Sequence, residues 1–189
     1  MLQSAAFLDR DGVINLNHGH VRKREDFDFI DGIFDVARYA RNQNFKLVVI
    51  TNQAGIGRGY YTEDDFHQLT EWMCEQFSAA GAPIDRVYFA PYHPTAGIGK
   101  YLKDDFSRKP HPGMILQART ELDLDLGSSV LIGDKASDIQ AGIAAGVGMN
   151  LLYAPQRLEE LDGLDYETIA TLHEALPYLT SSNAPRGVQ

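Results

Sequence analysis

Short apolar runs alternate with amphipathic segments along this chain, and that alternation restricts the fold more than any other feature of the sequence. The clearest run is 45–50, which is rich in β-branched residues and typical of a strand buried on both faces. Further strands are predicted near residues 5–8, 86–90, 129–132 and 147–152. Strands separated by helices favour a parallel sheet, because a parallel connection needs a long crossover. The sequence therefore predicts an α/β fold: a three-layer sandwich around a central parallel sheet with Rossmann-like topology.

The amphipathic segments predict the helices and the domain organisation. Helical spacing of apolar residues places helices near residues 32–42, 62–80, 112–122, 137–145 and 167–178. Thr62 precedes three acidic residues and is expected to cap the second helix. The glycine-rich run 55–59 is expected to form a loop. The segments after the first two strands are too short for a large cap domain, so we expect one domain over 1–180 and a polar tail over 181–189.

The charge of the chain limits its partners. A formal net charge of −9 repels nucleic-acid backbones and anionic membranes, so neither is expected to bind. The sequence contains neither a long apolar run nor a signal-peptide pattern, and its single cysteine, Cys74, cannot form an internal disulfide. We therefore expect a cytoplasmic protein. A site for phosphate in so acidic a chain would need its own local cations.

Polar residues gather where the predicted strands end. In an open parallel sheet, ligands bind beyond the carboxyl ends of the strands, so residues at these ends should meet at one edge. The residues placed there, or in the loop beside them, are Asp9, Asp11, Thr51, Asn52, Lys109, Asp134 and Asp138. Each has an ordinary explanation when taken alone: Asp11 can start a turn, and Asp134 can cap a helix. Only their combination indicates chemistry.

These residue types suit phosphoryl transfer. Several carboxylates held together repel one another unless a cation neutralises them, and a hard ion such as Mg²⁺ prefers oxygen ligands. A carboxylate can attack phosphorus, and a second one can move the proton of the leaving oxygen. A lysine offsets the negative charge of the transferring group. The sequence therefore predicts magnesium-dependent phosphate chemistry.

Four motifs resemble those of the haloacid dehalogenase superfamily. Residues 9–14 (DRDGVI) resemble its first motif, DxDGx(I/T). Thr51-Asn52, Lys109 and residues 133–138 resemble the second, third and fourth motifs, in order and after the expected strands. The segments 7–12, 51–59, 108–113 and 133–135 look more specifically like the D-glycero-D-manno-heptose-1,7-bisphosphate 7-phosphatases and the related histidinol-phosphate phosphatases. This resemblance extends over about residues 5–152.

The resemblance implies a role for each site residue. Asp9 would be the nucleophile and a Mg²⁺ ligand, and Asp11 the general acid and then the base, with its backbone carbonyl on the metal. Asp134 would be a further metal ligand, and Asp138 would orient Lys109 or a metal-bound water. The phosphoryl group would be bound by Thr51, Asn52 and Lys109. The expected contacts to the rest of the substrate are Gln53, Arg58, Arg108, Lys135 and His18. His18 and His20 are equally well explained as surface loop residues.

One departure from the family concerns zinc. The family carries a zinc loop, but its expected ligands are replaced here by Ala90, Tyr92, Asp105 and Ser107. His93 alone cannot supply the four ligands that zinc needs, so no zinc is expected. The loop 91–107 should then be ordered by packing, with Tyr92, Tyr101 and Phe106 as candidates, or by a subunit contact.

The expected function is hydrolysis of the phosphate on carbon 7 of a heptose 1,7-bisphosphate, in the synthesis of nucleotide-activated heptose for lipopolysaccharide, capsule or S-layer glycans. A small sugar bisphosphate would be the only partner of a monomer. Two alternatives stay open: a phosphatase for histidinol phosphate or another sugar phosphate, and a catalytically silent metal-binding scaffold. A phosphoacceptor of the response-regulator type is disfavoured, because Asp11 would promote rapid hydrolysis.

Overall fold

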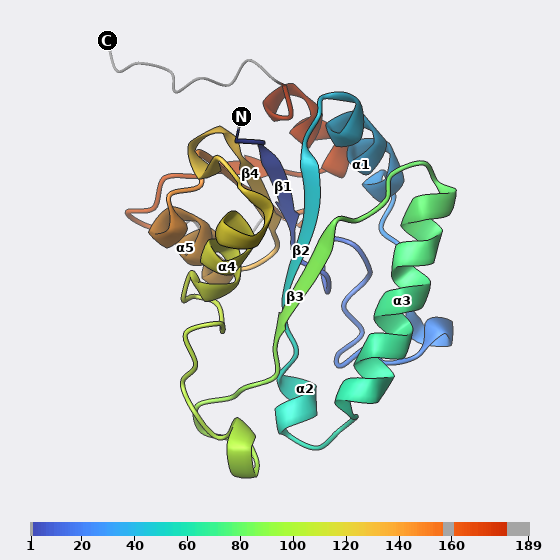
Figure 1. The fold of residues 1–189 in the computed structure, drawn as a ribbon, viewed down its shortest axis with the longest axis vertical. Helices are drawn as coiled ribbons and strands as arrows, with labels where there is room; N and C mark the ends of the chain where they lie inside the picture. Colours follow the sequence, from blue (N-terminus) through green and yellow to red (C-terminus); the bar gives the residue numbers. More distant parts are fainter. Residues whose placement is uncertain (1, 157–160, 181–189) are drawn as a thin grey trace.

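All the strands belong to one parallel sheet (Figure 1). The computed structural model describes residues 2–156 and 161–180, and it orders the six strands β3-β2-β1-β4-β5-β6. The strands are β1 (Ala5–Leu8), β2 (Lys46–Asn52), β3 (Arg86–Ala90), β4 (Val130–Gly133), β5 (Met149–Tyr153) and β6 (Glu167–Ile169). The chain builds the sheet outward from β1 to β3 and then returns to the other side of β1 with β4. The predicted α/β sandwich is confirmed, and the described residues hold no large cap domain.

Helices cover both faces of the sheet, and β1 shows why. Ala6 and Leu8 pack into one apolar cluster, whereas Ala5 and Phe7 pack into the other. Figure 1 shows the helices α1 (Ile33–Asn42) and α3 (Glu63–Ala79) on one side of the sheet, and α4 (Gly113–Leu122) and α5 (Ala136–Ala145) on the other. All four residues of β1 are fully buried. This central strand is therefore a rigid support for the residue that follows it.

The C-terminal segment differs from the predicted helix over 167–178. The residues Glu167–Ile169 instead form β6, which pairs in parallel with β5 in the register Leu151↔Glu167. The following residues form a 3-10 helix, η4 (Leu172–Tyr178), that contains Pro177. Proline cannot donate a backbone hydrogen bond inside a helix, and β-branched residues favour strands. The predicted tail over 181–189 lies outside the described residues.

Two smaller predictions also changed. The glycine-rich run contains a short helix, α2 (Ala54–Gly57), rather than only a loop. Strand β5 begins two residues after the predicted start, because the Val147 and Gly148 amides donate to Gly142 and Leu126 instead of a neighbouring strand. The remaining short 3-10 helices are η1 (Arg24–Asp26), η2 (Gly99–Tyr101) and η3 (Leu126–Ser128).

The predicted cap of α3 is confirmed. The Thr62 hydroxyl accepts a hydrogen bond from the Asp65 amide at 3.1 Å, and the Asp65 carboxylate accepts one from the Thr62 amide at 2.8 Å. This reciprocal pair satisfies two backbone donors at the helix start. Within the part of the chain that the structure describes, no helix is long and apolar enough to cross a membrane.

Candidate active site

The carboxyl ends of β1 and β4 bring two aspartates together. The Asp9 amide donates to the Ile132 carbonyl at 3.0 Å, which extends the pairing of β1 with β4 by one residue. Asp134 directly follows β4. Gly12 has a φ of +107°, and a Cβ on it would lie only 2.1 Å from an Asp134 carboxylate oxygen. The loop after β1 can therefore pass beside Asp134 only because residue 12 is glycine.

Lys109 joins this pair from a distant loop. Its Nζ donates to Asp9 Oδ1 at 2.8 Å and to the Ile50 carbonyl at 2.9 Å, and it lies 2.6 Å from Asp138 Oδ1. Only 3% of the lysine side chain is exposed. Burial alone would lower the pKa of Lys109, but the nearby Asp138 and Asp9 carboxylates outweigh it and raise the pKa above its usual value. The lysine is thus a fixed cation.

Asp138 has both carboxylate oxygens occupied by other groups. Oδ1 is paired with Lys109, and Oδ2 accepts hydrogen bonds from the Asp134 and Lys135 amides at 3.2 and 3.0 Å. These amides lie at the start of α5, where a negative charge is favourable. The arrangement suits the expectation that Asp138 orients Lys109, and it leaves little of this carboxylate for a metal.

The carboxylates fit a hard divalent cation. Asp9, Asp134 and Asp138 each offer a ligand atom within 4.8 Å of the others. Burial raises the pKa of Asp9 to about 8; Lys109 opposes this, while the Asp138 and Asp134 charges add to it. Burial also raises the pKa of Asp134. Both Asp138 oxygens have partners, whereas the hydrogen bonds of Asp9 and Asp134 are to Oδ1, so the side chains of Asp9 and Asp134 are better placed than that of Asp138 to hold Mg²⁺.

Asp11 is held by four N–H donors. Arg10 donates to both of its oxygens, from Nε to Oδ2 at 3.1 Å and from Nη2 to Oδ1 at 2.9 Å. Asn15 donates to Oδ1 at 3.1 Å, and Gln53 donates to Oδ2 at 2.9 Å. These four hydrogen bonds fix the orientation of the Asp11 side chain.

Arg10 was not among the predicted site residues. It is 1% exposed, donates to the Val21 carbonyl at 2.9 Å, and lies over the rings of Phe27 and Phe66. Its position between the two aspartates of the first motif was the only sequence signal. Sequence alone gave no sign that this arginine turns inward and holds Asp11.

The two amides after Thr51 serve the protein itself. Asn52 is clamped to the Lys109 backbone: Nδ2 donates to its carbonyl at 2.9 Å, and Oδ1 accepts from its amide at 3.0 Å. Gln53 Nε2 donates to Thr51 Oγ1 at 2.8 Å as well as to Asp11, and Gln53 Oε1 accepts from the Tyr61 hydroxyl. Substrate contacts by Asn52 and Gln53 stay predictions, since both amides already have partners.

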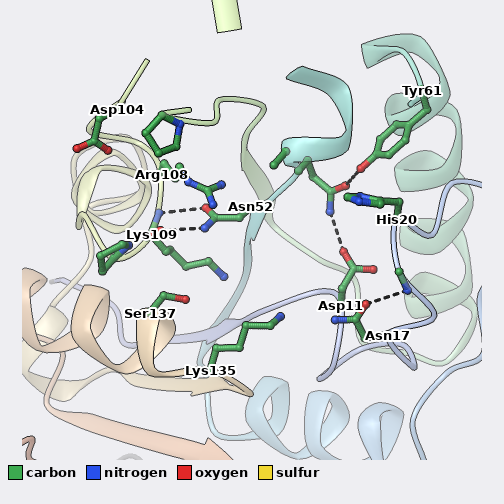
Figure 2. A pocket seen from close by; sticks show the side chains of 15 residues that line it. Asp11, Asn17, His20, Asn52, Tyr61, Asp104, Arg108, Lys109, Lys135 and Ser137 are labelled. Atoms are coloured by element: carbon green, nitrogen blue, oxygen red, sulfur yellow. Dashed lines mark hydrogen bonds between the residues drawn. The ribbon is translucent and has the colours of Figure 1, made fainter. Parts of the chain in front are cut away.

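A cavity of about 560 Å³ opens in front of these residues. Figure 2 shows Lys109 and Lys135 extending into it, with Arg108 nearby. These are local cations of the kind that an acidic chain needs for an anionic ligand. A smaller cavity of about 40 Å³ adjoins it, lined by Asp9, Thr51 and Asp138 among others. The cavity thus connects the aspartate cluster with open space for a substrate.

Some predicted residues lie elsewhere, and some wall residues were not predicted. His18 pairs with Asp28 at 2.9 Å on the surface, and Arg58 lies 4.8 Å from the Tyr60 ring centroid. Neither lines the large cavity, so their substrate contacts stay predictions. The unassigned residues Tyr61 and Asp104 do line it, together with His20.

The loop 91–107 is held by side-chain contacts. Lys103 Nζ lies 2.7 Å from Asp105 and 4.1 Å from the Tyr92 ring centroid. The Tyr101 hydroxyl donates to Glu63 at 2.5 Å. Phe106, in contrast, is 60% exposed, so its expected packing role is wrong. Tyr92 and Tyr101 are the aromatic residues that fix this loop beside the cavity.

Comparison with known proteins gives a consistent result. Residues 5–162 match the polynucleotide kinase 3 phosphatase family. The D-glycero-alpha-D-manno-heptose-1,7-bisphosphate 7-phosphatase of Burkholderia mallei is 49% identical over 187 residues, 99% of each chain. The D-glycero-beta-D-manno-heptose-1,7-bisphosphate 7-phosphatase of Yersinia pestis is 45% identical over 148 residues, 78% of this chain and 79% of that one. A D,D-heptose 1,7-bisphosphate phosphatase of B. bronchiseptica, complexed with magnesium and phosphate, shares the fold: its TM-score is 0.77 at 23% identity, over 94% of this chain and 98% of that one.

Proposed function

The chain belongs to the heptose-1,7-bisphosphate 7-phosphatase family of the haloacid dehalogenase superfamily, and we propose that it hydrolyses the phosphate on carbon 7 of D-glycero-D-manno-heptose 1,7-bisphosphate through an aspartyl phosphate on Asp9. One observation carries the mechanism. Lys109 fixes Asp9 from one side, at 2.8 Å, beside a cavity into which Asp11 also faces. A nucleophile, a proton-transfer group and a cation thus share one site.

The first step transfers the phosphoryl group to the protein. An oxygen of the Asp9 carboxylate bonds to phosphorus as the bond between phosphorus and the ester oxygen breaks. The Asp11 carboxyl gives its proton to that ester oxygen, so the sugar leaves as an alcohol. Lys109 Nζ offsets the negative charge that gathers on the phosphoryl oxygens. Thr51, whose oxygen accepts from Gln53, has its hydroxyl proton available for one of those oxygens.

The second step releases phosphate. The Asp11 carboxylate takes a proton from water as the water oxygen bonds to phosphorus, and the bond from phosphorus to Asp9 breaks. This restores the Asp9 carboxylate and the Asp11 acid. The four N–H groups around Asp11 hold its side chain in place for this proton transfer. Bound Mg²⁺, held by Asp9, Asp134 and the Asp11 carbonyl, would neutralise negative charge at the reacting phosphoryl group.

A small sugar bisphosphate suits this site better than a polynucleotide end, despite the name of the matching family. The net charge of −9 repels a nucleic-acid backbone. Arg108, Lys109 and Lys135 instead line one cavity, which supports binding of both phosphates of a small molecule there. The proposal includes a monomer acting in the cytoplasm, where nucleotide-activated sugars are made.

The test is phosphate release in the presence of Mg²⁺ from both anomers of the heptose bisphosphate. Histidinol phosphate, hexose phosphates and a 3′-phosphorylated oligonucleotide serve as competing substrates, and Asp9→Asn serves as the inactive control. We expect one heptose anomer to be the best substrate and Asp9→Asn to abolish release. A higher kcat/KM on histidinol phosphate or another ester would show that this ester, and not the heptose bisphosphate, is the preferred substrate. Release that survives Asp9→Asn would reject Asp9 as the nucleophile, whereas no release from any of these esters would favour the scaffold.

A further inference from the structure

A buried chain of hydrogen bonds runs from Tyr61 through Gln53 to Asp11 (Figure 2). The Tyr61 hydroxyl donates to Gln53 Oε1, and Gln53 Nε2 donates to Asp11 Oδ2 at 2.9 Å. We propose that Tyr61, acting through Gln53, is a positioning residue for the proton transfers of Asp11. This inference rests on the proposed function, since it assigns Asp11 the proton that the leaving group receives.

Tyr61 supports the orientation of the Gln53 amide in which its donor end faces Asp11. A glutamine amide can be turned by 180°, which exchanges its donor end and its acceptor end. In the observed orientation Oε1 accepts from Tyr61, and the NH₂ group faces both Asp11 and Thr51. The reversed amide would direct its oxygen at the Asp11 carboxylate and lose both hydrogen bonds. Gln53 is 2% exposed and Tyr61 7%, so solvent has little access to replace them.

The hydroxyl of Tyr61 is itself fixed by packing. The tyrosine ring belongs to a small buried cluster with Ile56 and Phe66, between α2 and α3. Gly55 makes the approach possible, because a Cβ on it would lie 2.3 Å from the Tyr61 ring. A glycine and two apolar side chains thus hold the Tyr61 hydroxyl against Gln53. This packing holds the hydroxyl at the far end of the path that leads through Gln53 to Asp11.

The consequence for catalysis depends on the leaving group. An alkoxide leaves slowly unless it is protonated, so cleavage of a sugar phosphate requires a well-placed acid. A p-nitrophenolate ion is stable without a proton, so cleavage of an aryl ester does not require this acid. The parameter kcat/KM reports only the steps up to release of the leaving group. If Tyr61 acts through Asp11, its loss must therefore lower kcat/KM for the alkyl ester and spare the aryl ester.

The experiment compares heptose 1,7-bisphosphate with p-nitrophenyl phosphate in the Mg²⁺-loaded enzyme. Tyr61→Phe removes one oxygen and keeps the ring. We expect kcat/KM on the heptose ester to fall about tenfold, and on the aryl ester to change by less than about twofold. Tyr88→Phe is the matched control: Tyr88 is also buried, and its hydroxyl donates to Glu121 at 2.8 Å, away from the site. Tyr88→Phe should leave kcat/KM on both esters unchanged, and it should change Tm by about as much as Tyr61→Phe does.

A double-mutant cycle tests the route through Gln53. Gln53→Met has a similar shape but no amide, and we expect it to lower kcat/KM on the heptose ester at least as much as Tyr61→Phe. Because Tyr61 acts through Gln53, the double variant should lose no more than Gln53→Met alone. An equal fall on both esters, no fall on either, or additive losses would overturn the inference. Activity that survives Asp9→Asn would instead reject the proposed function, so the two failures are distinguishable.

Discussion

Lys109 Nζ lies 2.6 Å from Asp138 Oδ1, and both side chains are at least 97% buried. Lys109 reaches this position from the loop after β3, and Asp138 from the first turn of α5. The same lysine is 2.8 Å from Asp9 at the end of β1. One cation thus ties together the three parts of the chain that form the site, and its loss would leave two buried carboxylates facing each other.

Replacing this lysine should therefore impair both stability and turnover. We expect Lys109→Met to lower the free energy of unfolding by about 3 kcal/mol in EDTA, because removing one partner of a buried ion pair strands the other. Turnover should fall on the order of 10²-fold or more, through loss of charge stabilisation. Urea unfolding and phosphate release measure the two effects.

The matched control is Lys46→Met, which removes a partly exposed pair with Asp85. Such pairs contribute little, so this variant should unfold within about 1 kcal/mol of the wild type and keep its turnover. A Lys109→Met protein that is as stable as Lys46→Met would contradict the bridging role.

The metal-free protein should lose stability as the pH rises. Burial raises the pKa of Asp9 from 3.8 to about 8, so the unfolded chain releases this proton more readily than the folded one. The stabilising contribution of the protonated group is complete below pH 3.8 and disappears as the pH approaches 8. In EDTA, Tm should therefore fall between pH 5 and pH 8 by on the order of 5 °C more in the wild type than in Asp9→Asn. Thermal unfolding at several pH values measures this difference.

Magnesium should reverse that effect. A bound cation favours the ionised Asp9, so added Mg²⁺ should raise the Tm of the wild type most at pH 8. Asp9→Asn should show little of this rise. A wild-type Tm that does not change with added Mg²⁺ at any pH would argue against a metal site at Asp9 and Asp134.

Arg10 should matter more for turnover than for substrate binding. Arg10→Met removes two of the four hydrogen bonds to Asp11 and leaves the Val21 carbonyl without this donor. We expect kcat to fall on the order of tenfold or more, with KM changed by less than about threefold. The free energy of unfolding should fall by about 2 kcal/mol, because buried acceptors lose a charged donor. Unchanged kcat would show that Asn15 and Gln53 suffice to hold Asp11.

The purified protein should contain no stoichiometric zinc. The loop 91–107 is held by contacts such as those of Lys103 with Asp105 and Tyr92, and the sulfur ligands that zinc favours are absent from its sequence. Elemental analysis after growth in zinc-supplemented medium should find well below one zinc per chain. A zinc chelator should leave the Mg²⁺-dependent activity unchanged. One tightly bound zinc per chain would disprove this prediction.

Local patterns in the sequence were sufficient for five of the six strands and for the positions of the main site residues. The apolar run before Thr51 predicts a buried strand by composition alone, and the residue after such a strand must lie at the edge of a parallel sheet. Asp9 and Asp134 were placed by the same reasoning. The cap at Thr62 was predictable because its hydrogen bonds span only three residues.

Only the tertiary structure decided how those residues are supported. The pairing of β6 with β5, the inward turn of Arg10 and the path from Tyr61 to Asp11 depend on contacts between segments that are distant along the chain or on side-chain directions set by packing. Periodicity records which face of an element is buried, but not what a buried polar group meets there. Gln53 illustrates the difference: its sequence position suggested a substrate contact, whereas burial requires all its polar atoms to find partners, and the fold supplies them from Tyr61, Thr51 and Asp11.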